Sequence, residues 1–238
     1  MKTVEAIESL EKYVMFDLNT FRHVIGEKSS YARLLLHRMK KNGHVFQIQK
    51  NRYTLYKDPF LIASRIVWPS YISLWSALRY YNLTEQIPHD IWVVTSRKTR
   101  RKMIKYSNAN IIFIYTKPKY FFGFKKIISN NFEIFIAEPE KVLIDSMLFR
   151  KISFSEIASV IKNNRKDLNI KKLIGFAVKT ENKALIKRLG YLLEKLGMDY
   201  YPRLKKYVYP AYTPLEYNLP SEGKRIEKWK IIENMVID

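Results

Sequence analysis

The sequence predicts an α+β protein, in which a small helical module precedes a larger α/β region with a small mixed sheet and several helices. Between residues 18 and 57, two short helix patterns are followed by a tight basic hairpin pattern. Three runs of β-branched and aromatic residues, each bounded by turn residues, follow between residues 91 and 137. Helix signals dominate after residue 138. We therefore expect two domains, residues 1–57 and residues 58–238.

Two helices are expected at the start of the small module. The first is predicted by an apolar stripe at helical spacing, made of Val4, Ile7, Leu10 and Val14. Glutamates occupy its outer face and would repel phosphate, so we expect this helix to be scaffold. In the second helix the inner face is formed by Phe21, Val24 and Ile25. Gly26 follows where the chain needs a left-handed turn.

The third helix, within residues 29–42, has one apolar and one polar face. Spacing of i, i+3, i+4 and i+7 directs four side chains inward: Ala32, Leu35, Leu36 and Met39. The opposite face carries Ser30, Arg33, His37 and Lys41. We expect Ser29 or Ser30 to cap this helix, which leaves its amide donors available to a phosphate.

A hairpin is predicted after the third helix. Asn42 and Gly43 are expected to end the helix with a left-handed residue. Two alternating segments, 44–49 and 52–56, then predict strands around a turn at Lys50 and Asn51. Helices followed by such a hairpin are the layout of a winged helix-turn-helix, in which the hairpin is the wing.

This module is strongly basic, with nine Lys and Arg residues and one acidic residue from Thr20 to Lys57. Phosphate is the favoured counterpart of such a surface, which predicts binding to double-stranded DNA. Arg33 is the best candidate for a bidentate guanine contact. Leu34 either meets a thymine methyl group or packs under the wing. The candidate DNA-binding residues are Lys28, Ser29, Ser30, Tyr31, Arg33, His37, Lys41, Lys50, Asn51 and Arg52.

The larger region begins after a break at Asp58. A linking helix is expected at 60–66, and a second helix, capped by Trp68-Pro69-Ser70, is expected to run to Asn82. Strands are expected at 91–95, 111–116 and 132–137, with a fourth before Ser129 that forms a hairpin with the third. The following helices are expected to start at Glu138, Ser153, Asn169 and Thr180, and the last of them to end at Gly197. The final segment is expected to wrap the surface of the domain.

One further charge cluster follows a predicted strand and includes no acid: Arg97, Lys98, Arg100, Arg101, Lys102 and Lys105. It is either a solvated loop or a second phosphate contact with DNA.

The composition narrows the classes of function. A formal net charge of +21 fits a nucleic acid or an anionic membrane surface, although an AT-biased coding sequence would also produce many lysines. The absence of cysteine excludes disulfides and thiolate metal sites. The four histidines lack ligand spacing, so we expect no metal and no cofactor. Without a secretory signal or a long apolar run, we expect a cytoplasmic protein that does not contact a membrane.

Further segments match a known family in order and spacing: Tyr71–Pro88, Ile136–Asp145, Lys187–Gly197 and the closing KWKIIEN. Together they resemble the AbiEi antitoxin family, which are predicted transcriptional regulators of viral-defence systems. The resemblance spans nearly the whole chain and implies a winged helix-turn-helix ahead of an antitoxin domain. The helix within 29–42 and the wing at 50–52 match the family's DNA-reading elements. The family's wing usually has a glycine where this chain has Asn51, which also tolerates positive φ.

The resemblance also implies a function. It implies a repressor of its own operon that binds an inverted repeat, as a dimer or as two monomers, and whose partner is a nucleotidyltransferase-like toxin of a type IV toxin–antitoxin system. A regulator without a toxin is one alternative.

A metal-dependent nuclease is the other alternative, because Glu133, Glu138, Glu140 and Lys141 lie near the predicted strands. The adjacency of Glu140 and Lys141 argues against a Glu-x-Lys centre. Glu138 and Glu140 are also explained by the start of a helix, where carboxylates lie near the positive end of the helix dipole. We therefore expect no catalytic activity.

Overall fold

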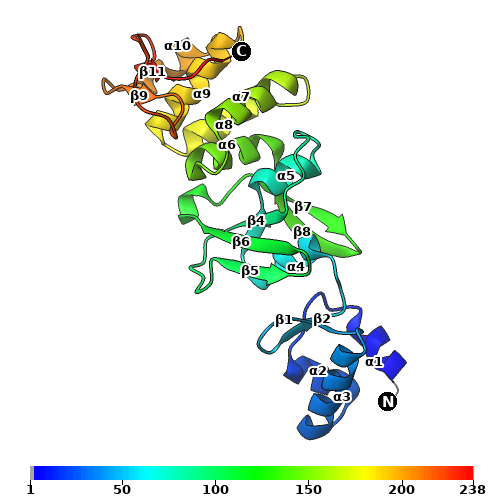
Figure 1. The fold of residues 1–238 in the computed structure, drawn as a ribbon. Helices are drawn as coiled ribbons and strands as arrows, with labels where there is room; N and C mark the ends of the chain where they lie inside the picture. Colours follow the sequence, from blue (N-terminus) through cyan, green and yellow to red (C-terminus); the bar gives the residue numbers. More distant parts are fainter. Residues whose placement is uncertain (1–2, 238) are drawn as a thin grey trace. The chain divides into compact units, whose positions relative to one another are not determined.

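Helices and strands are mixed along the chain in the computed structural model, which describes residues 3–237 (Figure 1). This confirms the α+β class. The chain divides into two compact units. The first holds the described residues up to 72 with 89–116 and 126–135, and the second holds 73–88, 117–125 and the residues from 136 on. Each unit combines segments that are separate in the sequence, so the division into residues 1–57 and 58–238 stays a prediction.

The amino-terminal segment folds as three helices and a two-stranded antiparallel hairpin (Figure 1). Their side chains form a hydrophobic cluster in which Phe21 and Met39 are at most 1% exposed. The predicted inner face of the third helix is confirmed, because all four of its residues are buried. The elements are α1 (Thr3–Leu10), α2 (Leu18–Ile25), α3 (Ser29–Lys41), β1 (Phe46–Gln49) and β2 (Arg52–Thr54).

Two predicted details of this segment are wrong. The apolar stripe of the first helix forms only in part: Leu10 is buried and Ile7 packs against the core, but Val4 is 64% exposed and Val14, although buried, lies beyond the end of α1. Ala6, which was not predicted, is also buried. Neither serine caps α3, since Ser29 is already in the helix and Lys28 is the N-cap residue. The Lys28 side chain accepts no cap hydrogen bond, because an ammonium group has no lone pair.

Local signals explain the boundaries of α2. The Asp17 carboxylate accepts a hydrogen bond from the Thr20 backbone N–H at 2.8 Å, and this bond lowers the pKa of the carboxyl group. At the other end Gly26 has φ of 69°, the left-handed conformation that the sequence predicts. Phe16 and Tyr53 exchange backbone hydrogen bonds of 2.9 and 2.8 Å, so the hairpin is attached to the chain just before α2.

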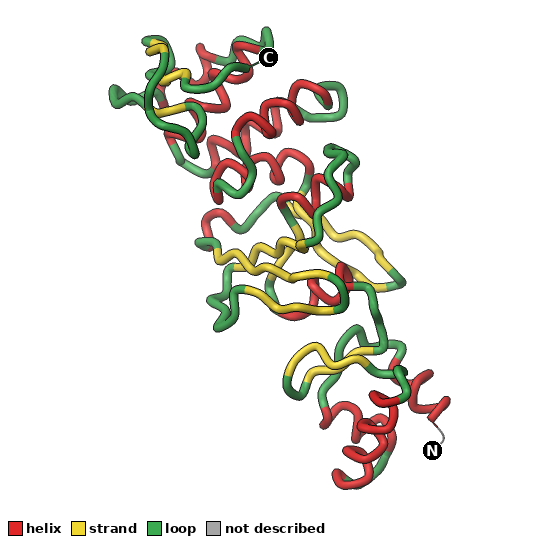
Figure 2. Tube along the Cα trace, viewed as in Figure 1, coloured by secondary structure: helices red, strands yellow, loops and turns green. Residues whose placement is uncertain are grey.

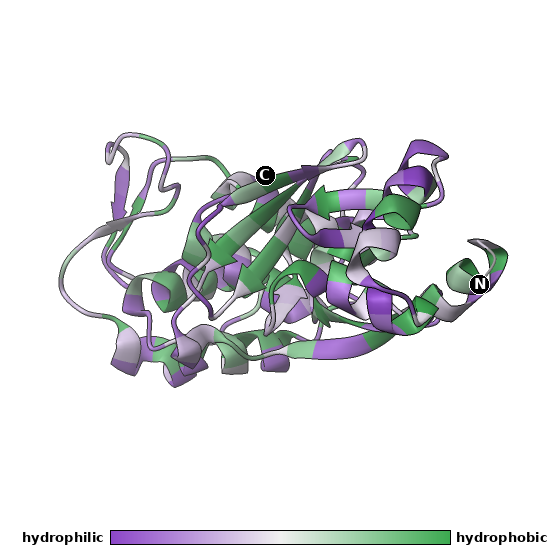
Figure 3. Cartoon of the chain, turned by 90° about the horizontal axis from the view of Figure 1, so that it is seen from below, coloured by the Kyte–Doolittle hydropathy of each residue, from purple (hydrophilic) through white to green (hydrophobic). Residues whose placement is uncertain are grey.

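A six-stranded mixed sheet follows, with the strand order β5-β6-β4-β3-β8-β7. Strands are drawn in yellow in Figure 2. β4 and β6 are parallel, whereas β3 with β4 and β5 with β6 are antiparallel. Much of the sheet is drawn in the colour of hydrophobic residues in Figure 3, and Val93 and Ile111 are fully buried. The strands are β3 (Ser70–Ile72), β4 (Asp90–Thr95), β5 (Met103–Tyr106), β6 (Ala109–Tyr115), β7 (Phe124–Ser129) and β8 (Phe132–Ala137).

The four predicted strands are confirmed as β4, β6, β8 and β7, the last two being neighbours joined through Asn130 and Asn131. Two strands of this sheet were not predicted. Ser70–Ile72, expected to be helical, is β3 with all three residues buried, so the helix starts only at Leu74. β5 lies within the basic segment. Strands of three and four residues are too short to show a clear period of two.

The remaining helices mostly begin at the predicted residues. Ser153 and Asn169 accept backbone hydrogen bonds at the starts of α7 and α8, and Glu138 is the N-cap residue of α6. Thr180 does not cap α9 as expected. Asn182 does, through a bond of 3.1 Å from the Leu185 N–H. The helices are α4 (Pro59–Ile66), α5 (Leu74–Tyr80), a 3-10 turn (Pro118–Tyr120), α6 (Pro139–Phe149), α7 (Phe154–Asn163), α8 (Ile170–Lys179) and α9 (Lys183–Lys195).

The final segment has more regular structure than the expected surface wrap. Its three-stranded sheet has the order β10-β11-β9. Trp229 is fully buried, and the Lys187 ammonium of α9 donates to the carbonyl oxygens of Ala211 and Lys230 at 2.7 and 3.0 Å. These long-range contacts leave no local period in the sequence. The elements are α10 (Tyr201–Leu204), a 3-10 turn (Lys205–Tyr207), β9 (Thr213–Pro214), β10 (Lys224–Ile226) and β11 (Ile231–Glu233).

Among residues 3–237, no helix has both the length and the apolar character needed to span a membrane.

Candidate nucleic-acid interface

The outer face of α3 is exposed and basic. All four residues predicted to point outward are exposed: Ser30, Arg33, His37 and Lys41. The other candidates at this end of the helix are partly or well exposed, with Tyr31 at 42%. Leu34, for which the sequence leaves a thymine methyl contact and packing under the hairpin open, is 46% exposed. The face therefore combines positive charge, hydroxyl groups and one apolar side chain.

A hollow of about 300 Å³ lies beside this face. It is lined by four residues of α3, by Leu18 of α2 and by Tyr53 of the hairpin; the four are Arg33, Leu36, His37 and Lys40. Lys40 also donates a hydrogen bond of 3.0 Å to the Gln47 side chain of β1. The hollow thus places three nitrogen-bearing side chains of α3 against the hairpin.

Lys40 was missing from the predicted set, although it lies three residues after His37 and seven after Arg33. That spacing places all three on one helical face. The signal was therefore present in the sequence.

Two side chains at the turn of the hairpin form hydrogen bonds to the backbone of α2 and α4. The Asn51 side-chain oxygen accepts a hydrogen bond of 3.1 Å from the Leu18 backbone N–H, and Asn51 has φ of 57°. The Arg52 guanidinium donates at 2.8 Å to the carbonyl oxygen of Ile66, the last residue of α4. These two side chains position the hairpin, whereas the exposed Lys50 is the residue most available to a ligand.

A second connection joins the sheet to the chain that leaves the hairpin. The Tyr106 hydroxyl of β5 donates at 2.5 Å to the Tyr56 carbonyl oxygen, and burial raises the pKa of Tyr106 to about 12. The Tyr56 ring lies edge-on to Phe132, with ring centroids 5.3 Å apart. Tyr56, two residues after β2, is therefore in contact with both β5 and β8.

Between the hairpin and the loop that joins β4 to β5 lies a larger groove of about 770 Å³. We call it the basic groove. Seven cationic residues from three parts of the chain line it, together with Met15, Gln49, Ile66, Val67, Trp68, Thr99, Ile104 and Phe113. The seven are Lys50, Arg52, Arg65, Arg97, Lys98, Arg100 and Arg101. Since no acidic residue lines it, the groove has the character of an anion-binding surface.

The structure therefore brings two separately predicted sets together. Lys50 and Arg52 of the hairpin share the basic groove with four members of the cluster that follows β4. Lys102 and Lys105, the other two members, are exposed but do not line it.

Arg65 and Trp68 were not predicted as site residues. Arg65 donates at 2.6 Å to the Glu133 carbonyl oxygen, and its Nε atom is buried with no partner. Neither residue belongs to a local pattern of charge, and only the folding of the chain reveals their positions.

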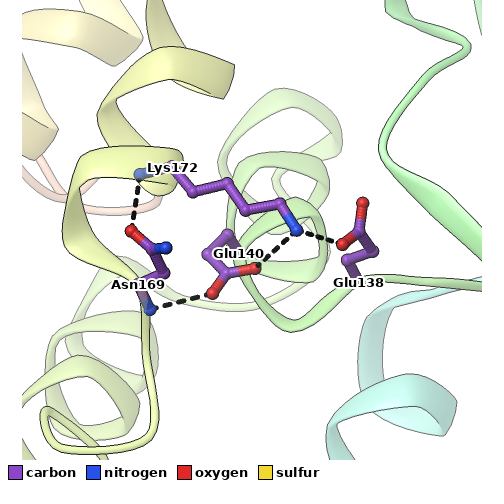
Figure 4. A network of polar contacts seen from close by, with 4 residues as sticks. All are labelled: Glu138, Glu140, Asn169 and Lys172. Atoms are coloured by element: carbon purple, nitrogen blue, oxygen red, sulfur yellow. Dashed lines mark hydrogen bonds and ion pairs between the residues drawn. The ribbon is translucent and has the colours of Figure 1, made fainter.

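The acids considered for a nuclease centre have structural partners. Glu140 accepts the Asn169 backbone N–H at 2.9 Å and lies 3.9 Å from the Lys172 ammonium, which also pairs with Glu138 (Figure 4). Lys141 is fully buried and pairs with Asp145. Glu140 therefore stabilises the start of α8, and Lys172 offsets the charges of both glutamates.

Residues 3–237 contain no group of three or more His, Asp or Glu side chains that could hold a metal ion. The four histidines are all exposed.

Comparison of the sequence with protein-family models gives no match, and comparison with curated proteins gives none either. Function must therefore be argued from the residues of this chain.

Proposed function

We propose that this protein is a sequence-specific repressor that binds double-stranded DNA through a winged helix-turn-helix. In this proposal α2 and α3 form the helix-turn-helix, α3 enters the major groove, and the β1–β2 hairpin is the wing. The observation that carries it is the outer face of α3, where Ser30, Arg33 and His37 are exposed opposite a fully packed inner face. A helix with this division presents side chains to base edges without disturbing its core.

Phosphate contacts are assigned to the surfaces on either side of the wing. Lys40, in the hollow beside α3, and Lys50, at the tip of the wing, are exposed cations. The cluster from Arg97 to Lys105 is the second phosphate contact in this proposal. Such contacts set the register of a protein on the duplex and make its affinity depend on salt.

Repression of its own operon and an antitoxin role are the finer parts of the proposal. They rest on the resemblance of the sequence to the AbiEi antitoxin family, which also supplies the inverted-repeat operator and the nucleotidyltransferase-like toxin as partner. The proposal assigns the chain no catalytic step. A regulator without a toxin fits the same DNA-binding surface, and the reading frames beside the gene distinguish the two.

The central test is a competition gel-shift assay with the region upstream of the gene and a random duplex of equal length. Arg33→Ala should weaken binding to the specific duplex by about 1–3 kcal/mol, because one bidentate base contact is lost. Binding to the random duplex should change much less. Lys171→Ala, which removes one exposed positive charge that the proposal does not assign to DNA contact, is the matched control for loss of charge. Equal losses on both duplexes with Arg33→Ala would show that Arg33 contacts phosphate and does not read a base.

A further inference from the structure

The basic groove combines its cations with an exposed aromatic ring. Trp68 is 54% exposed, lines the groove, and packs against Phe135 with ring centroids 5.4 Å apart. Arg97 and Lys98 line the same groove. Contacts to phosphate need positive charge and do not need an aromatic side chain. The groove therefore offers more than a phosphate-binding surface requires.

We propose that the basic groove binds an unpaired stretch of nucleic acid, in which a base stacks on Trp68 while Arg and Lys side chains contact the backbone phosphates. Surfaces that bind single strands combine these two features, a positive groove and aromatic side chains on which bases stack. In a duplex the faces of each base are covered by its neighbours. A ring such as Trp68 finds an open base face only where the strand is unpaired.

The size of the groove agrees with this ligand. Its volume of about 770 Å³ lies within the range of about 300–1,000 Å³ that is typical of small-ligand pockets. A space of this size accepts a few units of a single strand.

The groove is also held in shape before any ligand binds. Arg52 donates to the Ile66 carbonyl oxygen at 2.8 Å and Arg97 donates to the Trp68 carbonyl oxygen at 3.2 Å. The hairpin wall and the loop wall are thus attached to one short segment, residues 66–68. Little conformational entropy remains to be lost there on binding.

The groove shares its cations with the proposed duplex phosphate contacts, but its stacking residue Trp68 does not belong to the α3 face that reads the duplex, so the two proposals can be tested apart. Binding of the full-length protein to a fluorescein-labelled thymidine oligonucleotide of about 10 nucleotides, a length typical of single-strand sites, is measured by fluorescence anisotropy. Trp68→Ala should weaken this binding by about 5- to 150-fold, the effect of losing one stacked base. Trp68→Phe should keep most of the affinity, because phenylalanine also stacks. A uridine oligonucleotide should show the same dependence on Trp68.

The matched control is Tyr115→Ala, which removes another exposed aromatic ring, 46% exposed, that does not line the groove. It should leave the affinity for the oligonucleotide unchanged. Circular dichroism melting of each variant checks that the fold is intact, and Trp68→Phe provides the measurement if Trp68→Ala unfolds. Quenching of tryptophan fluorescence by the oligonucleotide, present in the wild type and reduced in Trp68→Phe, is the independent readout.

Three results would overturn the inference: no binding of the oligonucleotide by the wild type, equal affinity of the wild type and Trp68→Ala, or binding of thymidine monophosphate as tight as that of the oligonucleotide. A loss of duplex binding in Trp68→Ala as large as the loss of single-strand binding would also overturn it. Arg33→Ala separates the two proposals, because it should weaken duplex binding and leave the oligonucleotide unaffected.

Discussion

Removing the four loop cations of the basic groove should reduce the salt dependence of DNA binding. The variant replaces Arg97, Lys98, Arg100 and Arg101 with alanine, all of which line the groove. Each phosphate contact contributes about 0.9 to the slope of log affinity against log salt concentration. Loss of four contacts should therefore lower the slope by about 3.6. Between about 50 and 200 mM salt, the variant should lose about 150-fold less affinity than the wild type loses.

The assay is fluorescence anisotropy with the upstream duplex and a random duplex, each measured at several salt concentrations. The base preference, given by the ratio of the two affinities, should stay unchanged because α3 is intact. A control variant with alanine at Lys166, Lys171, Lys183 and Lys205 removes the same charge from exposed positions that do not line the groove. It should change the slope much less.

An unchanged slope in the groove variant would refute the assignment of phosphate contacts to the groove. An equal change in both variants would refute it too, since the effect would then come from the total charge of the protein. A change in base preference would mean that the loop reads sequence.

Three further predictions concern stability and are checked by urea denaturation. Gly190→Ala should lower the free energy of unfolding by about 1–3 kcal/mol, because the added Cβ would lie 2.2 Å from the buried ring of Trp229. Gly175→Ala, whose Cβ would meet no atom within 4 Å, should raise it by roughly 0.5–1 kcal/mol. Equal stability of the two variants would contradict this prediction. Asp17→Ala should cost about 1 kcal/mol by removing the cap of α2, and Asp17→Asn, which can still accept the hydrogen bond, should cost less. Burial, and secondarily the charge of Arg188, lower the pKa of Lys187 from 10.5 to about 8. Between these pH values the unfolded chain binds more protons than the folded chain, so Lys187 should make the free energy of unfolding rise with pH. Lys187→Met should reduce that rise. Parallel profiles of stability against pH for the wild type and Lys187→Met would show that Lys187 does not cause it.

The charge cluster from Arg97 to Lys105 shows how much of a binding site a local sequence pattern can predict. Its charge and its place after a strand were visible in the sequence, which left a solvated loop and a phosphate contact open. The fold adds that four of its members share a groove with Lys50 and Arg52. No sequence signal links residue 50 to residue 97, because the groove depends on where α4 and β4 place the two loops.

The strand β3 and the burial of Lys187 and Trp229 were not predicted, because they also depend on contacts between segments that are distant in the sequence. β3 is a strand because its three residues pair with β4 and are buried, and no period could reveal this in so short a segment. Lys187 and Trp229 are buried through contacts between α9 and the final segment, which are distant in the sequence.

Local features of this protein thus follow from the sequence, whereas features that depend on long-range contacts follow only from the tertiary structure. The sequence by itself determined the α+β class, the two faces of α3, the caps at Ser153 and Asn169, and four strands, because periodicity and capping depend on residues a few positions apart. Only the tertiary structure decided that the hairpin turn is attached through Asn51 and Arg52, and that cations from three segments line one groove with Trp68. Burial and long-range contacts place those groups, and they arise only when the chain is folded.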